Sequence, residues 1–241
     1  DEFLLKLKNC PIGEYHLRLH YIKNIVRTRG AKVVEKELNE LLDLKYPSAI
    51  LFVTNLYLRG DYDISRRKLL NMLNSVFGDD PRCSNILFDK FSDDSSVDIS
   101  CVVGSIKKFA EAGLTTSMET LGRAYWSGKG IGQDLNMAAH WMREAFSAGN
   151  IWAAVELADI LKMINTPDSL SEMISVLEML KDRGDPSGIL RLGHAYRDGI
   201  GVNQNIALAK ILYSSAQDKG VKQAGVELDK LNNSSSRNSL I

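Results

Sequence analysis

The sequence predicts an all-α fold, an α/α superhelix or solenoid of about six helix-turn-helix repeats followed by a C-terminal helix. Glycines recur at intervals of 36, 35 and 36 residues, and leucines keep step with them, also at intervals of 36, 35 and 36. A fixed period of this length is typical of repeat architectures. The chain has only five prolines, which suits long helices. The two series are Gly113, Gly149, Gly184 and Gly220, and Leu121, Leu157, Leu192 and Leu228.

The N-terminal part carries the same pattern in weaker form. Residues 1–45 place apolar and charged residues at helical spacing, with Gly30 between two segments, which predicts a helical segment that is a divergent repeat. Residues 46–111 are predicted to form degenerate repeats. A first helix ends near Gly60, the segment Leu69 to Phe77 forms a second, and residues 80–111 supply another pair.

Residues 112–232 contain the clearest repeats. In one unit, Leu121, Ala124 and Tyr125 form a helical stripe that ends at Gly128 and Gly130, because glycine tolerates positive φ. Asp134 is placed to cap the next helix. A second unit repeats this pattern with Gly199, Gly201 and Asn205, whereas the unit between them has Asn165-Thr166-Pro167-Asp168 instead of the glycine loop. The Ser- and Asn-rich tail, residues 233–241, is predicted to be disordered.

The repeats resemble the Sel-one-like repeat (SLR) family, relatives of the tetratricopeptide (TPR) repeats. The residues that match the family pattern in order are Leu121, Gly122, Tyr125, Gly128, Gly130, Ile131, Asp134, Ala138, Trp141, Ala145, Ala148 and Gly149. The resemblance implies a right-handed superhelix that acts as an adaptor or scaffold for a protein or peptide partner, without catalytic residues or a cofactor. An alternative is that the chain is the accessory repeat region of a larger enzyme, for example one in bacterial envelope polysaccharide synthesis, with an upstream domain as its partner.

Composition excludes several classes of function. Thirty basic and thirty acidic residues give no net charge, which argues against nucleic-acid binding. No apolar run approaches the roughly 18 residues of a membrane span. Three cysteines without motif spacing argue against a disulfide framework or a zinc site and favour a reducing compartment such as the cytoplasm. The chain begins at Asp1 without a methionine, so its start is expected to be a processing boundary, and any targeting segment would lie outside the sequence.

Several local patterns have structural explanations. The glycines of residues 128–132 follow a predicted helix, whereas a phosphate-binding loop follows a strand. His16 and His20 have metal-ligand spacing but lack a third ligand, and no metal site is predicted. The acidic segment 92–98 lacks the ordered spacing of a calcium loop, so Asp98 or Ser96 is expected to cap a helix.

The candidate binding residues lie on one face of the first helix of each repeat. Trp141 is expected in the core, but Trp126 and Trp152 fall on the face that lines the concave groove in TPR-like repeats, where aromatic residues anchor partners. Packing of each tryptophan against the adjacent repeat is the rival interpretation. The same offsets place charged residues on the concave face, where they would contact a partner or form a solvated helix surface. These are Glu119, Arg123, Asp159, Lys162, His194 and Arg197.

Overall fold

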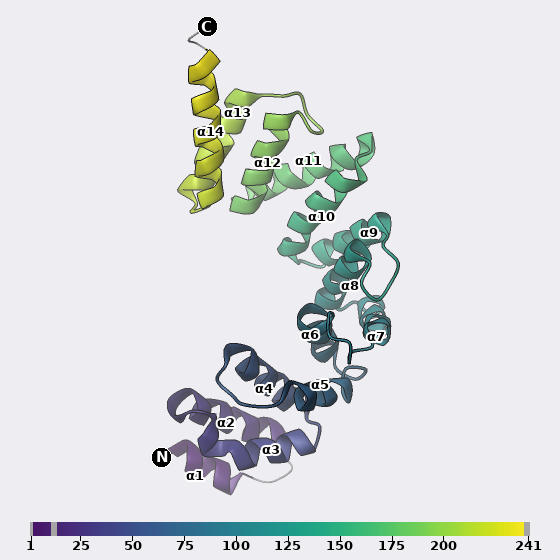
Figure 1. Cartoon of the computed structure of the whole chain (residues 1–241), viewed down its shortest axis with the longest axis vertical. Helices are drawn as coiled ribbons and strands as arrows, with labels where there is room; N and C mark the ends of the chain where they lie inside the picture. Colours follow the sequence, from purple (N-terminus) through teal and green to yellow (C-terminus); the bar gives the residue numbers. More distant parts are fainter. Residues whose placement is uncertain (1, 11–13, 239–241) are drawn as a thin grey trace. The chain divides into compact units, whose positions relative to one another are not determined.

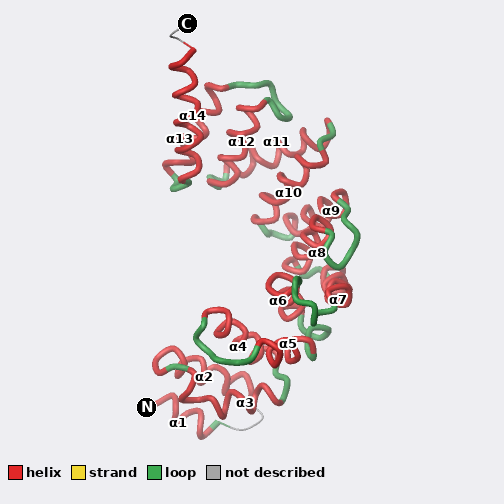
Figure 2. Tube along the Cα trace, viewed as in Figure 1, coloured by secondary structure: helices red, strands yellow, loops and turns green. Residues whose placement is uncertain are grey.

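The computed structural model describes residues 2–10 and 14–238, and its regular structure there is helical, with no strand (Figures 1 and 2). The chain divides into two compact units, which we call the N-terminal unit, Asp1–Ala112, and the C-terminal unit, Gly113–Ile241. Successive helices pair along the chain within each unit, and the prediction of an all-α solenoid of repeats is confirmed.

The N-terminal unit contains three helix pairs preceded by an additional short helix. Its helices α2 and α3 are separated by Gly30 and a 3-10 turn at Ala31–Val34, as the sequence predicts for the position of the break. The helices are α1 (Glu2–Asn9), α2 (Tyr15–Arg29), α3 (Glu35–Asp43), α4 (Pro47–Arg59), α5 (Arg66–Asn74), α6 (Pro81–Phe91) and α7 (Ile99–Glu111).

The C-terminal unit contains three further pairs and a final helix. Each first helix packs against the second helix of its own pair, and α10 and α12 also pack against the second helix of the preceding pair, as α14 does against α13. The core therefore continues from one pair to the next within the unit. The helices are α8 (Thr115–Ser127), α9 (Leu135–Ser147), α10 (Ile151–Ile164), α11 (Pro167–Asp182), α12 (Pro186–Asp198), α13 (Ile206–Asp218) and α14 (Lys222–Asn238).

The helix ends follow from local backbone chemistry. Gly128 and Gly130 have φ angles of 75° and 71°, which end α8 and redirect the chain at no steric cost. The Asp134 carboxylate then accepts hydrogen bonds from the first backbone N–H groups of α9. In the middle repeat, Asn165 adopts the left-handed conformation instead, with φ 55°, and Thr166 caps α11. A capping box in α11 thus replaces the glycine loop.

Small residues allow the paired helices to approach closely. A Cβ at Gly122 of α8 would lie 2.9 Å from the end of the Met142 side chain. A Cβ at Gly193, the equivalent position in α12, would lie 2.6 Å from the ring of the fully buried Tyr213. Trp141, which the sequence places in the core, is only half-buried: its Nε1 atom is covered, and other parts of the ring reach the surface.

Helix α14 continues to Asn238, whereas the sequence predicts a disordered tail from residue 233. Serine and asparagine are only moderately poor helix formers, and extending an existing helix adds a hydrogen bond for each residue ordered. Disorder of residues 233–238 stays a prediction, and residues 239–241 lie outside the described part of the chain.

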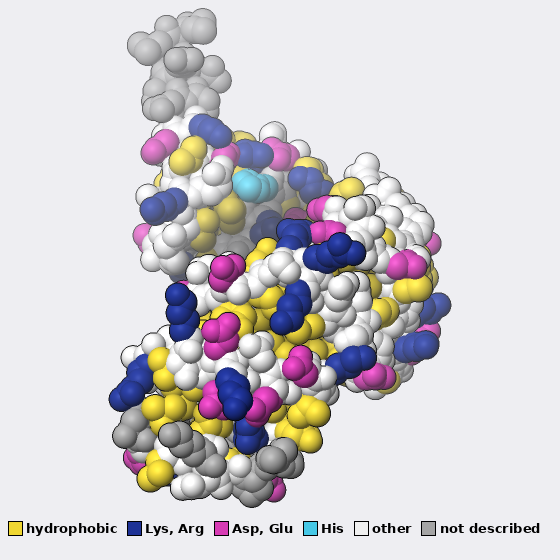
Figure 3. Space-filling view, turned by 60° about the horizontal axis from the view of Figure 1, so that its bottom comes forward, with side chains coloured by type: hydrophobic (Ala, Val, Ile, Leu, Met, Phe, Trp, Pro, Cys, Tyr) yellow, Lys and Arg dark blue, Asp and Glu magenta, His cyan; other side chains and the backbone are white. Residues whose placement is uncertain are grey.

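The described surface carries charges of both signs. On the face drawn in Figure 3, basic and acidic side chains are interspersed among hydrophobic ones. Within residues 2–10 and 14–238, no helix is long and apolar enough to span a bilayer. The three cysteines are free thiols.

Candidate functional site

The predicted site residues lie on the first helices of the three C-terminal repeats. Glu119, Arg123 and Trp126 belong to α8; Trp152, Asp159 and Lys162 belong to α10; and His194 and Arg197 belong to α12. Ion pairs connect these helices in order from α8 to α14. The helices therefore share a charged face, which we call the first-helix face.

The α8 end of this face is a network of paired groups. The Arg123 guanidinium donates to Glu119 at 2.9 Å, and its Nε lies 3.9 Å from the Glu156 carboxylate of α10. Asn150, just before α10, also donates to Glu119. These groups are half-buried and already have partners, so their main role is to connect α8 to α10.

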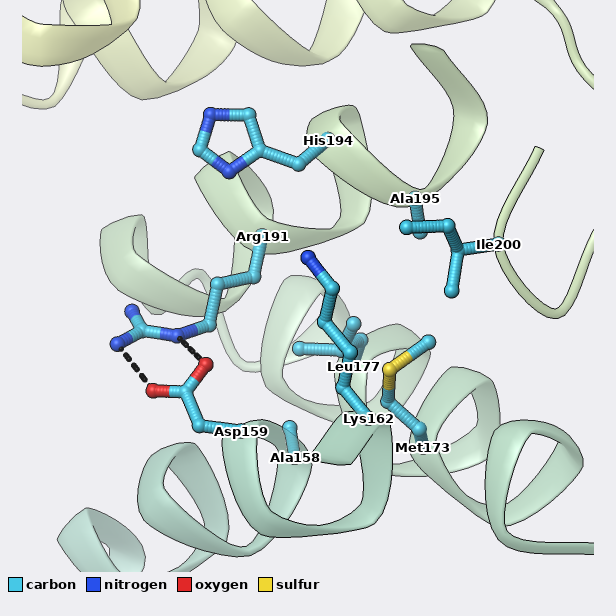
Figure 4. A pocket seen from close by; sticks show the side chains of 9 residues that line it. All are labelled: Ala158, Asp159, Lys162, Met173, Leu177, Arg191, His194, Ala195 and Ile200. Carbon is cyan, nitrogen blue, oxygen red and sulfur yellow. Dashed lines mark hydrogen bonds and ion pairs between the residues drawn. The ribbon is translucent and has the colours of Figure 1, made fainter. Parts of the chain in front are cut away.

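A small pocket lies at the centre of the face, between α10 and α12 (Figure 4). Its floor is apolar, with Ala158, Met173, Leu177, Ala195 and Ile200. Asp159, Lys162, Arg191 and His194 form the polar part of its lining. Its volume of about 60 Å³ is enough for a few water molecules or one small side chain, but not for a drug-sized ligand.

The polar groups of the pocket differ in how they are held. Arg191 of α12 donates two hydrogen bonds to Asp159, of 2.9 and 2.8 Å, and this bidentate pair raises the pKa of the guanidinium. Lys162 extends from α10 toward α12 (Figure 4), and in the described residues it forms no hydrogen bond or ion pair. Lys162 is therefore the cation at the pocket that is open to a partner.

His194 is fixed by packing rather than by ion pairing. Its ring lies 5.5 Å from the Tyr213 ring in an edge-to-face arrangement. Burial, with a further contribution from the Arg197 charge, lowers the pKa of His194 below its ordinary value, so the imidazole is neutral at pH 7. A neutral imidazole offers one donor and one acceptor to a bound group.

Arg197 lies at the α14 end of the face and is fully occupied. It binds the neighbouring Asp198 and reaches Glu227 of α14 at 2.7 Å. The Asp198 hydrogen bonds raise the pKa of the guanidinium further above its already high value. Arg197 therefore connects α12 to the last helix and does not line the pocket.

The two tryptophans of the face have different environments. Trp126 is half-buried, packs against the core, and directs its Nε1–H at the Met163 sulfur of α10, 3.1 Å away. This is the arrangement of the rival interpretation, in which the ring packs against the adjacent repeat. Trp152, in the first turn of α10, is 71% exposed. Trp152 therefore presents an aromatic surface to solvent.

Three charged residues of the face are absent from the sequence-based set. Glu156, Arg191 and Glu227 complete the ion pairs to Arg123, Asp159 and Arg197. Glu156 and Arg191 are 35 residues apart, and Arg191 and Glu227 are 36 apart, so they occupy one repeat position. The repeat period of 35 to 36 residues could have revealed these three charged residues as a second row. Glu156 and Arg191 each stand three residues before Asp159 and His194, which belong to the predicted row.

Two segments of the C-terminal unit match a known family. Residues 117–150 and 186–221, which comprise α8–α9 and α12–α13 with their loops, match the Sel1 repeat. Each of these two segments is therefore similar to a Sel1 repeat. Repeats of this family generally serve as scaffolds for protein–protein interaction and are typically non-catalytic. The α10–α11 pair between the Sel1 repeats lacks the glycine loop of the two matched segments.

Solved structures share the fold over most of the chain. One is c5321, a protective antigen present in uropathogenic Escherichia coli strains that displays an SLR fold. The two structures match with a TM-score of 0.72 and 20% sequence identity, and the match covers 94% of this chain and 50% of c5321. Another is a Sel1 repeat protein from Oxalobacter formigenes, with a TM-score of 0.56 and 22% identity over 75% and 74% of the two chains. The chain thus spans half the length of c5321. No curated protein matches it.

Proposed function

We propose that the C-terminal unit binds a segment of a protein partner along the first-helix face, without catalysing a reaction. The observation that carries the proposal is the pocket between α10 and α12, where Lys162 is open to a partner beside an apolar floor. Binding energy in protein interfaces concentrates at such places, where an anchor side chain fills a pocket. The Sel1 repeats on either side of α10–α11 support a scaffold role.

The polar and aromatic groups of this face divide into two sets. Arg123, Arg191 and Arg197 stabilise the stacking of the first helices through ion pairs. Trp152 and Lys162 are exposed on α10 and stand outside those pairs. Trp152 and Asp159 are seven residues apart, which places them on one stripe of the helix. A partner segment lying along α10 would therefore contact the Trp152 ring and reach the pocket.

The test compares the wild-type chain with a Trp152→Ala, Lys162→Ala double variant in affinity purification with quantitative mass spectrometry. Both side chains are exposed, so we expect the helical circular dichroism to be unchanged. Loss of an aromatic anchor and a lysine should reduce partner recovery at least tenfold. The matched control is Ile211→Ala with Lys219→Ala, which removes an exposed apolar group and a lysine from α13 and its C-cap. Equal recovery by the folded double variant and the wild type would refute the proposed surface.

A further inference from the structure

The N-terminal unit contains a second groove, separate from the first-helix face of the Sel1 repeats. It lies between α2 and α4, which are in contact, and has a volume of about 500 Å³. That volume is within the range of ligand-binding pockets, about 300–1,000 Å³. Its lining combines the cations Lys23, Arg27 and Arg59 with the apolar residues Val26, Phe52 and Leu56.

Helical spacing explains why these residues face each other. Lys23 and Arg27 are one turn apart on α2, and Phe52, Leu56 and Arg59 follow one stripe of α4 at i, i+4 and i+7. The Lys23 ammonium lies 5.6 Å from the centroid of the Phe52 ring, across the two helices. Leu56 is buried at the base of the groove, and Lys23, Arg27 and Arg59 are exposed at its rim. The groove therefore has an apolar floor and a basic rim.

The basic charge of the groove is poorly compensated. Helix α2 contains four basic residues and no acidic one, and α4 contains one basic residue and no acidic one. Arg18 of α2 binds Glu40 of α3 at 2.9 Å, on another side of the helix. Elsewhere in the described residues, no ion pair joins Lys23, Arg27 or Arg59 to a carboxylate. Asp61 is the acidic residue among the groove lining.

Helix electrostatics account for part of this arrangement. Arg27 and Arg59 lie in the last turns of their helices, where a cation stabilises the helix by about 0.3–1 kcal/mol. This effect does not extend to Lys23, which lies in the middle of α2. Nor does it explain why both helices that form the groove lack acidic residues, when Glu–Lys pairs one turn apart would stabilise each helix.

We propose that this groove binds an acidic segment of a protein partner. Carboxylates of the segment would pair with Lys23, Arg27 and Arg59, and an apolar side chain between them would cover Phe52 and Leu56. The apolar floor and the zero net charge of the chain favour a peptide over a nucleic acid, whose binding relies on a broad basic surface. Charge complementarity of this kind selects among partners and speeds association.

The test is a selection from a random 12-residue peptide display library on the immobilised full chain, with three forms of the protein. The wild type should enrich peptides that are rich in Asp and Glu and contain an apolar residue. An Arg27→Gln, Arg59→Gln variant should lose that enrichment. A synthetic peptide of the selected consensus should bind this variant at least fivefold more weakly than the wild type, and its binding to the wild type should weaken in 0.5 M salt.

The control variant is Lys90→Gln with Lys108→Gln, which removes two exposed cations from the last turns of α6 and α7. It matches the groove variant in charge and helix position and should select the same peptides as the wild type. Peptides without an acidic excess, or an acidic excess that persists in the groove variant, would overturn the proposal. Binding of a 12-nucleotide single strand with the same dependence on Arg27 and Arg59 would overturn the assignment to a protein partner. The Trp152 and Lys162 variant tests the other unit, so the two proposals fail independently.

Discussion

The close packing of α12 against α13 makes a specific prediction for Gly193. Replacing Gly193 with alanine places a Cβ 2.6 and 2.8 Å from two carbons of the Tyr213 ring, where non-bonded carbons prefer about 3.5–4.0 Å. Tyr213 is fully buried, so the ring or the backbone of α12 must move by nearly 1 Å. Overpacking of this severity costs about 3 kcal/mol, the upper end for added methyl groups.

The alanine also has a favourable effect, because it is a better helix former than glycine by about 1 kcal/mol. The net destabilisation is then about 2 kcal/mol, which lowers the melting temperature by about 6 °C. Gly122 is the matched control: it occupies the same repeat position, but its neighbour is the flexible Met142, whose end can rotate away. Gly122→Ala should therefore leave the stability within about 0.5 kcal/mol of wild type, since a small clash offsets the gain in helix propensity.

The assay is thermal and urea unfolding followed by tryptophan fluorescence. The three tryptophans of the chain, Trp126, Trp141 and Trp152, all lie in the C-terminal unit, so the signal reports that unit alone. An unchanged urea m-value would show that both variants unfold from the same compact state. Equal melting temperatures for Gly193→Ala and Gly122→Ala would refute the reasoning, because they would mean that Tyr213 accommodates the methyl group as easily as Met142 does.

Three further predictions follow from side-chain chemistry. A double-mutant cycle on Asp159→Ala and Arg191→Ala should give a coupling energy of about 1 kcal/mol, and a value near zero would show that the bidentate pair does not join α10 to α12. The pKa of Glu227 is lowered by its hydrogen bond with Lys230, so its contribution to stability is present above about pH 4.5 and is lost as the pH falls through the depressed folded value. Glu227→Gln should reduce the loss of stability measured between pH 5 and pH 3, and an unchanged curve would contradict the assignment. Burial raises the pKa of Cys83 to about 12, so iodoacetamide at pH 8 should label it only after unfolding, as mass spectrometry can verify; rapid labelling of the native chain would contradict its burial.

Local chemistry explains which parts of the fold could be predicted from the sequence. Gly128, Gly130 and Asp134 act through the backbone of their own segment, so their roles follow from residue type and spacing alone. The same applies to Asn205, which caps α13, and to Gly30 at the end of α2. The end of α14 is less clear from composition, because a run of Ser and Asn residues only weakens a helix and does not terminate it.

The site was harder to predict, because its contacts depend on how repeats stack. Helical spacing places Trp126 and Trp152 on one face, but it does not tell how deeply each side chain is buried. The last turn of α8 lies against Met163 of α10, which covers Trp126, whereas Trp152 remains exposed in the first turn of α10. Arg191 was missed because spacing within one helix does not reach its partner Asp159, 32 residues away in the sequence; only the repeat period relates the two helices.

The ion pairs between first helices mean that the repeats cannot exchange places without mismatching charges. At one repeat position the chain carries Glu156, then Arg191, then Glu227, and each faces a group of opposite sign on the preceding first helix. Deleting the 35 residues from 151 to 185 would keep the period but bring Arg191 opposite Arg123, two like charges at a half-buried contact. A chain shortened in this way would lose the ion pair between Asp159 and Arg191 and gain electrostatic repulsion, so these contacts oppose the loss of a repeat.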